Sequence, residues 1–172
     1  MKNNNGQIPP FHIDLTGAHK NLTPNLTRTA ARAIIHDDKG SLLMLLSNKG
    51  DYKFPGGGLE ESETCEDALQ REVKEETGYA IEVGKHVGSA MERRRDFYDP
   101  GLVFEMVSHY YACTLKGKAE TPGLSGYETT LNLEAKWVHP LAALNANEGV
   151  STKLPWVRRE TEVLRKLLES TP

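Results

Sequence analysis

The strongest constraint on the fold lies in residues 56–79, where three consecutive glycines precede an acid-rich segment with helical punctuation. Thr64 can cap the start of a helix, with Asp67 three residues later as its capping-box partner. Gly78 stands where a helix commonly places its C-terminal glycine. The segment therefore predicts a helix over residues 65–77, joined to a glycine turn at a fixed distance.

Three glutamates of this helix, Glu72, Glu75 and Glu76, stand at i, i+3 and i+4 and share one face. At about 100° per residue they fall in an arc of roughly 100° centred on Ala68, which is the packing side. Two carboxylates about 4 Å apart repel by roughly 4 kcal/mol at an effective dielectric near 20. A solvated acidic face is the ordinary alternative, but an inward position favours a site for a hard divalent cation.

The spacing of the segment resembles the Nudix box, G-x5-E-x7-R-E-U-x-E-E-x-G-U, in which U is aliphatic. The matching positions are Gly57, Glu63, Arg71, Glu72, Val73, Glu75, Glu76 and Gly78. The single departure is Tyr79, where an aliphatic residue is more usual, and that position packs and carries no chemistry. The preceding Phe54-Pro55-Gly56-Gly57 is also similar to the lead-in of the family.

This resemblance implies an α/β (α+β) fold, a Nudix-type α/β/α sandwich with a central mixed β-sheet. It implies hydrolysis of a diphosphate linkage in a nucleoside diphosphate joined to another moiety, with Mg²⁺ or Mn²⁺ as cofactor. The partner would then be a nucleotide-type diphosphate small molecule. Such hydrolysis needs the diphosphate charge neutralised and a water made more acidic, which oxygen-ligated Mg²⁺ achieves.

Family roles pass to the matching positions. Arg71 would orient the glutamates, and Glu63 would pair with Arg71 or assist through a water. The attacking water needs a base, for which Glu75 or Glu76 is the default and Glu128, in the loop at residues 116–131, an outside candidate. Glu128 is equally well interpreted as a solvated loop acid. The metal ligands implied are Glu72, Glu75, Glu76 and the backbone carbonyl of Gly56.

Substrate binding should come from outside the box. Arg93 and Arg95 would share one face of a strand and Arg94 the other, and a guanidinium can hold a phosphate in bidentate fashion. An edge strand kept soluble by charge explains the same run. The residues assigned to substrate binding are Arg93, Arg95, Phe54 and Glu128.

The remaining chain predicts one domain, with residues 1–24 as a partly irregular arm and residues 25–172 as the hydrolase domain. Within the arm, a short strand is expected at residues 11–15. Residues 27–36 and 41–46 flank a turn and predict an antiparallel hairpin. Residues 102–115, apolar on both faces, predict a central strand. Further elements are expected as strands at 79–87, 92–95 and 132–138 and as helices at 140–145 and 155–169.

A net charge of −3, from 21 basic and 24 acidic residues, argues against broad nucleic-acid binding and leaves room for one basic pocket. RNA decapping would share the chemistry but need a larger basic surface. No membrane span or signal peptide is expected. Cys65 and Cys113 make neither a disulfide framework nor a metal-ligand spacing, so a cytoplasmic protein is expected.

Two alternatives stay open at this point. A Nudix-fold nucleotide-binding regulatory module without catalysis is one, although such modules usually lose a metal ligand and this box is intact. A homodimer is the other, because many members of the family dimerise and no feature of this sequence decides it. The sequence does not name the base or sugar of the substrate.

Overall fold

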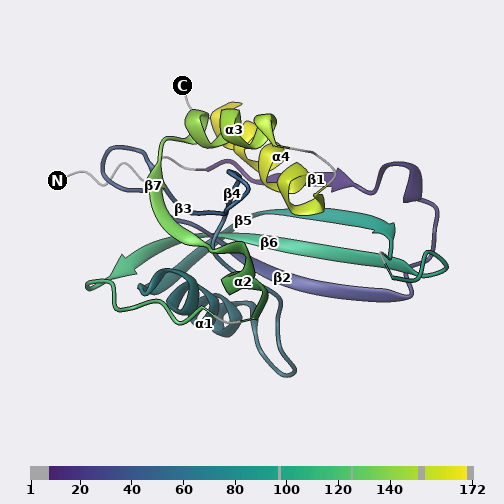
Figure 1. Ribbon diagram of the computed structural model, residues 1–172, viewed down its shortest axis with the longest axis horizontal. Helices are drawn as coiled ribbons and strands as arrows, with labels where there is room; N and C mark the ends of the chain where they lie inside the picture. Colours follow the sequence, from purple (N-terminus) through teal and green to yellow (C-terminus); the bar gives the residue numbers. More distant parts are fainter. Residues whose placement is uncertain (1–7, 97, 125, 151–153, 170–172) are drawn as a thin grey trace.

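Two β-sheets lie between helices, with α1 (Cys65–Thr77) on one side and α3 (Pro140–Gly149) and α4 (Pro155–Glu169) on the other (Figure 1). The computed structural model of the protein describes residues 8–96, 98–124, 126–150 and 154–169. The α/β/α sandwich with a mixed sheet is confirmed. Within the described ranges, no helix has the length and apolar character needed to cross a membrane.

The larger sheet has the order β1-β5-β6-β2. Its strands are β1 (Phe11–Leu15), β5 (Ala80–Arg95), β6 (Val103–Lys116) and β2 (Leu26–Ile34). The long strands β5 and β6 pair antiparallel, whereas β1 joins β5 and β2 joins β6 in parallel. The prediction that residues 102–115 form a central strand is confirmed, since β6 lies between β5 and β2.

The smaller sheet has the order β4-β3-β7 and is antiparallel throughout. Its strands are β3 (Leu42–Leu46), β4 (Tyr52–Lys53) and β7 (Glu134–Val138). A short helix, α2 (Gly126–Leu131), precedes β7 within the segment that the sequence presents as a loop.

The predicted hairpin of residues 27–36 and 41–46 forms only at its turn. His36 and Leu42 make an isolated antiparallel bridge, and the Leu43 N–H donates to the Ile35 carbonyl at 3.0 Å. Beyond these contacts the two strands part, β2 into the larger sheet and β3 into the smaller one. The hairpin prediction is therefore wrong for most of its length.

The reason lies at the outer edge of β2, which is occupied by the glycine segment (residues 55–58). The Ala31 N–H donates to the Gly57 carbonyl at 3.0 Å, and the Ala33 N–H donates to the Pro55 carbonyl at 2.8 Å. Backbone groups at a sheet edge need partners, and here the glycine segment supplies them instead of β3. The glycines are thereby fixed against the main sheet.

Apolar side chains fill both interfaces of the sandwich. On the α1 side, Leu69 and Val73 of the helix are fully buried against Ala31 and Ala33 of β2. On the other side, the core residues of α3 and α4 pack against the larger sheet; they include Ala143, Leu144, Val163, Leu164 and Leu167. Ile13 and Leu15 of β1 belong to this second core, so the strand expected within residues 1–24 is part of the sheet.

Candidate active site

Helix α1 begins and ends as its sequence predicts. The Asp67 N–H donates to Thr64 Oγ1 and the Thr64 N–H donates to Asp67 Oδ2, both at 3.1 Å, which completes the capping box. Gly78 ends the helix with a left-handed φ of 76°. A Cβ there would lie 1.9 Å from the Glu120 carbonyl oxygen, so only glycine fits.

The inward face of α1 carries a buried carboxylate. Glu76 is 2% exposed and accepts a hydrogen bond of 2.7 Å from the Gly56 N–H. Burial raises the pKa of Glu76 to about 8, and the Lys53 ammonium and the Gly56 N–H offset part of that rise. The three glutamates are unequal: the side chains of Glu72 and Glu75 are 12% and 42% exposed.

Arg71 contacts three other acids of the segment, Glu63, Glu72 and Glu75. Its Nε and Nη2 donate to the two carboxylate oxygens of Glu63 at 2.7 and 2.9 Å, and its Nη1 donates to Glu72 at 2.9 Å. Glu75 lies 3.6 Å from the same Nη1. The hydrogen bonds from Arg71 lower the pKa of Glu63 to about 2. The structure thus brings the predicted pair of Arg71 and Glu63 together with Glu72 and Glu75.

Two glycines of the segment exclude a side chain for different reasons. Gly56 has a φ of 126°, and a Cβ there would lie 2.1 Å from the Ala31 carbonyl oxygen. At Gly57, a Cβ would lie 2.3 Å from Glu72 Oε1, so the missing side chain leaves room for that carboxylate. The Gly56 carbonyl accepts a hydrogen bond from Arg32 Nη1.

The donor set of this site suits a hard divalent cation. Carboxylates and a backbone carbonyl are the ligands that Mg²⁺ and Mn²⁺ prefer. Because Gly57 has no side chain, the Glu72 carboxylate can lie next to the glycine segment. Among the described residues no three acidic, histidine or cysteine side chains converge as a metal cluster, and Arg71 forms ion pairs with Glu72 and Glu75. By ligand type, the residues fit such an ion.

A pocket of about 460 Å³ adjoins this carboxylate site on the α4 side of the larger sheet. Two of its residues touch the site, since Arg32 donates to the Gly56 carbonyl and Lys53 acts electrostatically on Glu76. Five lining residues are basic and two are acidic, which makes the pocket positive. Its lining residues are Leu26, Arg28, Arg32, Lys53, Glu92, Arg94, Asp96, Tyr98, Phe104, Met106, Trp156 and Arg159.

Not all of these cations are equally available to a ligand. Arg159, 3% exposed, bonds Glu92 at 2.6 Å and Glu160 at 2.7 Å, and the Arg94 guanidinium lies 4.5 Å from the centre of the Phe104 ring. By contrast, the side chains of Arg28 and Lys53 make no hydrogen bond or ion pair with any described residue. The buried Arg32 Nε likewise has no partner in the described part of the chain. Buried donors are seldom left unpaired, so Arg32 is suited to an incoming acceptor.

The structure places three of the four predicted substrate residues outside the lining of this pocket. Phe54 is fully buried, with its ring edge-on to Tyr110 at 5.7 Å, so it packs in the core. Arg93 and Arg95 lie on the opposite face of β5 from Arg94, which alone of the three lines the pocket. The side chain of Glu128 lies outside the described residues.

The basic pocket residues that the sequence did not predict are Arg28, Arg32, Lys53 and Arg159. The sequence prediction also assigned Arg93 and Arg95 to substrate binding, whereas it is Arg94 that lines the pocket. One signal was present. Arg32 stands in a run of small and apolar residues that predicts a buried strand, and a charged side chain is almost never fully buried unless it is paired. Arg159 gave no comparable signal, since its neighbours Arg158 and Glu160 are also charged.

Arg93 instead holds the chain that follows β1. Its Nε donates to Glu105 at 2.9 Å, and its Nη1 donates to the carbonyls of Lys20 and Leu22. Arg93→Gln should lower the free energy of unfolding by about 1–3 kcal/mol, because Glu105 and those carbonyls lose their partner. Urea denaturation measures this change.

The exposed neighbour gives the matched control. Arg95→Gln removes a guanidinium that, among the described residues, bonds only the Pro100 carbonyl at 3.3 Å, and should change stability by less than about 0.5 kcal/mol. If the Arg93 and Arg95 variants unfold at the same urea concentration, Arg93 has no such structural role.

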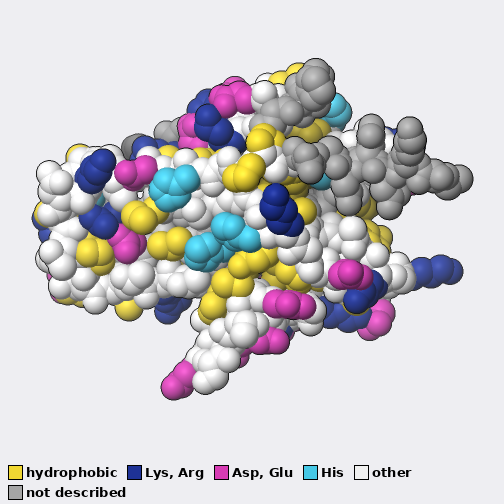
Figure 2. All heavy atoms as spheres, turned by 180° about the vertical axis from the view of Figure 1, so that it is seen from behind, with side chains coloured by type: hydrophobic (Ala, Val, Ile, Leu, Met, Phe, Trp, Pro, Cys, Tyr) yellow, Lys and Arg dark blue, Asp and Glu magenta, His cyan; other side chains and the backbone are white. Residues whose placement is uncertain are grey.

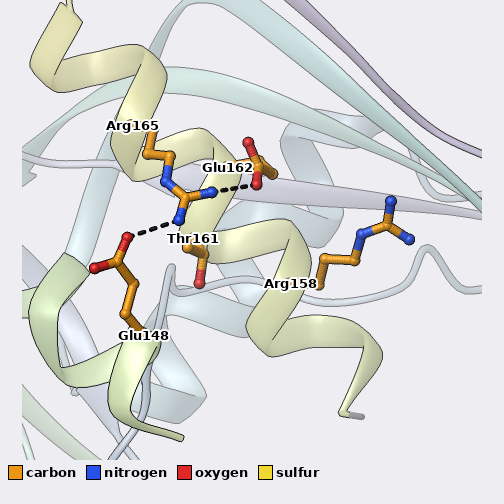
Figure 3. Close-up of a pocket in the computed structure, with 5 residues that line it drawn as sticks. All are labelled: Glu148, Arg158, Thr161, Glu162 and Arg165. Carbon is orange, nitrogen blue, oxygen red and sulfur yellow. Dashed lines mark hydrogen bonds and ion pairs between the residues drawn. The ribbon is translucent and has the colours of Figure 1, made fainter. Parts of the chain in front are cut away.

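A second hollow, of about 330 Å³, lies between α3 and α4 (Figure 3). Arg165 bonds Glu148 at 2.6 Å and Glu162 at 2.5 Å there, whereas Arg158 points away from them. Both of its glutamates are paired with Arg165, and none of its lining residues comes from α1 or the sheets. It offers no comparable reactive group.

Comparison with known proteins agrees with the site. A 70-residue segment is 40% identical to an ADP-ribose pyrophosphatase of Methanocaldococcus jannaschii, covering 39% of this chain and 41% of that protein. A 60-residue segment is 37% identical to a MutT-like protein of Streptomyces ambofaciens, covering 35% of this chain and 39% of that protein. The chain spans only 24% to 41% of the length of the curated relatives that it matches.

Among solved structures, a NUDIX hydrolase from Nitrosomonas europaea superposes with a TM-score of 0.56 at 19% identity, over 81% of this chain and 87% of that one. Such a likeness concerns the fold alone. The family description of the NUDIX domain matches residues 26–159, which is more than half of the chain and includes the whole glycine segment and α1. The chain belongs to the NUDIX family.

Proposed function

We propose that the protein hydrolyses a diphosphate linkage in a nucleotide-type small molecule, with Mg²⁺ or Mn²⁺ as cofactor. The observation that carries the proposal is that the carboxylate site lies directly beside the basic pocket. The buried Glu76 carboxylate and the Gly56 carbonyl adjoin a pocket with five basic side chains. The similarity to an ADP-ribose pyrophosphatase over part of the chain supports the same substrate class.

The pocket residues would bind different parts of the substrate. Lys53 and Arg32, next to Glu76, would bind the phosphate oxygens nearest the carboxylates, and Arg28 would bind those farther out. Leu26 and Phe104 offer an apolar wall to the rest of the substrate. The positive lining neutralises charge that would otherwise repel an anionic nucleophile.

The glutamates and Arg71 would act on the reacting end. Arg71 keeps Glu63 and Glu72 oriented, and Glu75 or Glu76 would take the proton of the attacking water. The chemistry that Mg²⁺ or Mn²⁺ supplies when bound is charge neutralisation and a more acidic water.

A substrate screen with Mg²⁺ and Mn²⁺ tests the proposal. It should cover nucleoside triphosphates, ADP-sugars, dinucleoside polyphosphates and nucleotide coenzymes, with release of nucleoside monophosphate or phosphate as the readout. We expect turnover of at least one class, lost in Glu75→Gln and kept in Glu66→Gln, which changes an exposed acid of the same helix. No turnover with either ion, combined with tight nucleotide binding, would favour a regulatory module instead.

The role of the outer pocket can be measured separately. Arg28→Gln removes one charge-assisted phosphate contact, so kcat/KM should fall by about 10- to 100-fold, mainly through KM. Arg28 is exposed and bonds no described residue, so the fold should be unaffected. Arg158→Gln, which removes a guanidinium of the second hollow, is the control and should leave the kinetics unchanged.

The compartment we propose is the cytoplasm. Cys65 and Cys113 are both free thiols, and burial raises the pKa of the Cys113 thiol to about 12. Free thiols are ordinary in a reducing compartment.

A further inference from the structure

The open face of the β5–β6 pair carries two histidines whose rings lie together. His86 and His109 have ring centroids 5.4 Å apart, and Tyr111 packs edge-on against His86 at 5.1 Å. His86 is exposed and His109 half-buried. The view from behind shows histidine side chains gathered among hydrophobic ones on the open surface (Figure 2).

An irregularity of β5 puts His86 on that face. Ser89 pairs with His109 and lies on its face, so strict alternation would turn residue 86, three positions earlier, to the other face. The register shifts on both sides of His86, however, between Val83 and His86 and again before Gly88. Bulges of this kind re-aim a side chain and are common beside functional sites. Here the bulge moves an imidazole next to His109.

The two rings are aimed at each other through their nitrogens. His109 Nδ1 and His86 Nε2 are 3.3 Å apart and form a hydrogen bond, so a metal ion bound between the rings would take the place of the shared proton. Two nitrogens bound at 2.0–2.1 Å to one tetrahedral Zn²⁺ lie about 3.3–3.4 Å apart. The pair therefore already has the separation that a shared metal ion requires, on two adjacent strands of the main sheet.

We propose that His86 and His109 form a second metal site, open to solvent, for a borderline divalent ion such as Zn²⁺, Ni²⁺ or Cu²⁺. Imidazole nitrogens select such ions, whereas the carboxylates of α1 suit Mg²⁺ and Mn²⁺. Within the described residues no third histidine, cysteine or acid joins the pair, so water or an external ligand would complete the coordination.

The surroundings of His109 favour the neutral imidazole that a metal needs. Partial burial, and then the neighbouring His86, lower the pKa of His109, which favours its neutral form. The Tyr111 ring holds His86 in position and competes for no ion, because burial raises the pKa of its phenol to about 12.

Zinc titration tests the site. With Mg²⁺ in large excess to occupy the carboxylate site, Zn²⁺ should bind wild type at one equivalent in calorimetry, and the imidazole NMR signals of His86 and His109 should shift together. His86→Gln and His109→Gln should each weaken this binding at least about tenfold. The NMR readout uses wild type, so it holds even where a variant folds poorly.

His12→Gln is the matched control, because His12 is exposed on the same sheet face and bonds Ser89 Oγ at 2.9 Å instead of another imidazole. It should bind Zn²⁺ as wild type does. Three results would overturn the proposal: equal binding by all the variants, equal loss in His12→Gln, or displacement of Zn²⁺ by Mg²⁺.

Discussion

Glu76→Gln should lower kcat by at least about 10²- to 10³-fold, the loss that follows removal of one preorganised electrostatic group from a reaction centre. Glu76 is almost fully buried and accepts a hydrogen bond of 2.7 Å from the Gly56 N–H, whereas the side chains of Glu72 and Glu75 are 12% and 42% exposed. The amide keeps the size of the side chain and loses its charge. Turnover of the substrate found in the screen measures the effect, with Glu66→Gln as the exposed control.

The same substitution should stabilise the metal-free protein. The pKa of Glu76 in the fold is about 8, above its ordinary 4.5, because burial disfavours the charged form. Its contribution to stability is therefore fully present below pH 4.5 and is lost as the pH rises towards 8. In EDTA, the melting temperature of wild type should fall over that window more steeply than that of Glu76→Gln.

Added Mg²⁺ should reverse this dependence. A cation bound at the ionised carboxylate stabilises the fold by mass action, so the gain in melting temperature should be larger at pH 8 than at pH 5. Glu76→Gln should show little gain at either pH. Parallel melting curves for the two proteins with and without Mg²⁺ would contradict both the buried charge and its role in holding the ion.

Gly56→Ala should destabilise the protein by about 3 kcal/mol or more, because it combines backbone strain with a clash that nothing flexible can relieve. The φ of 126° is unfavourable for any L-residue, and the new Cβ would meet the Ala31 carbonyl oxygen at 2.1 Å. Since the Cβ is fixed to the hydrogen-bonded backbone of residue 56 and the Ala31 carbonyl belongs to β2, the glycine segment would have to leave the edge of β2. Chemical denaturation measures the loss.

The next two glycines separate stability from activity. In Gly57→Ala the nearest group to the new Cβ is the Glu72 carboxylate, at 2.3 Å, and this end of the side chain can rotate away. The free energy of unfolding should then be nearly unchanged, whereas kcat/KM should fall about 10- to 100-fold because the Glu72 carboxylate is displaced. In Gly58→Ala the nearest atom is the Thr29 carbonyl oxygen at 3.9 Å, an ordinary contact, so this variant is the control. Equal stability of all three alanine variants would refute the placement of the segment.

Local signals explain what the sequence predicted well. The capping box at Thr64, the glycine at residue 78 and the spacing of the glutamates act over a few residues, and α1 follows them. Helical periodicity predicted the inward direction of Glu76, which is buried, and of Glu72, whose side chain is 12% exposed, but it was wrong for Glu75, whose side chain is 42% exposed. The predicted pairing of Arg71 with Glu63 comes from the same compact segment.

Competition between distant segments explains what the sequence did not predict. The turn before β3 favours a hairpin, but the glycine segment outcompetes β3 for the edge of β2. Strand alternation correctly predicted that Arg94 lies on the opposite face of β5 from Arg93 and Arg95. Which of these two faces lines the pocket depends on where α4 packs, and strand alternation does not determine that. The pocket also draws Lys53 and Arg159 from elements far apart in the sequence, and no short pattern connects them.

The attachment of the glycine segment to β2 has a consequence for motion at the site. Loops around a reaction centre usually open readily, because few of their backbone groups are held. Here the Pro55 and Gly57 carbonyls accept bonds from a strand of the main sheet, and Gly56 is bonded from both of its polar atoms. Opening the segment would expose the edge of the sheet and the Glu76 carboxylate at once. We therefore expect the proposed reaction centre to be one of the stiffer parts of the molecule, and substitutions that adapt the protein to a new substrate to be tolerated better in the pocket beyond it.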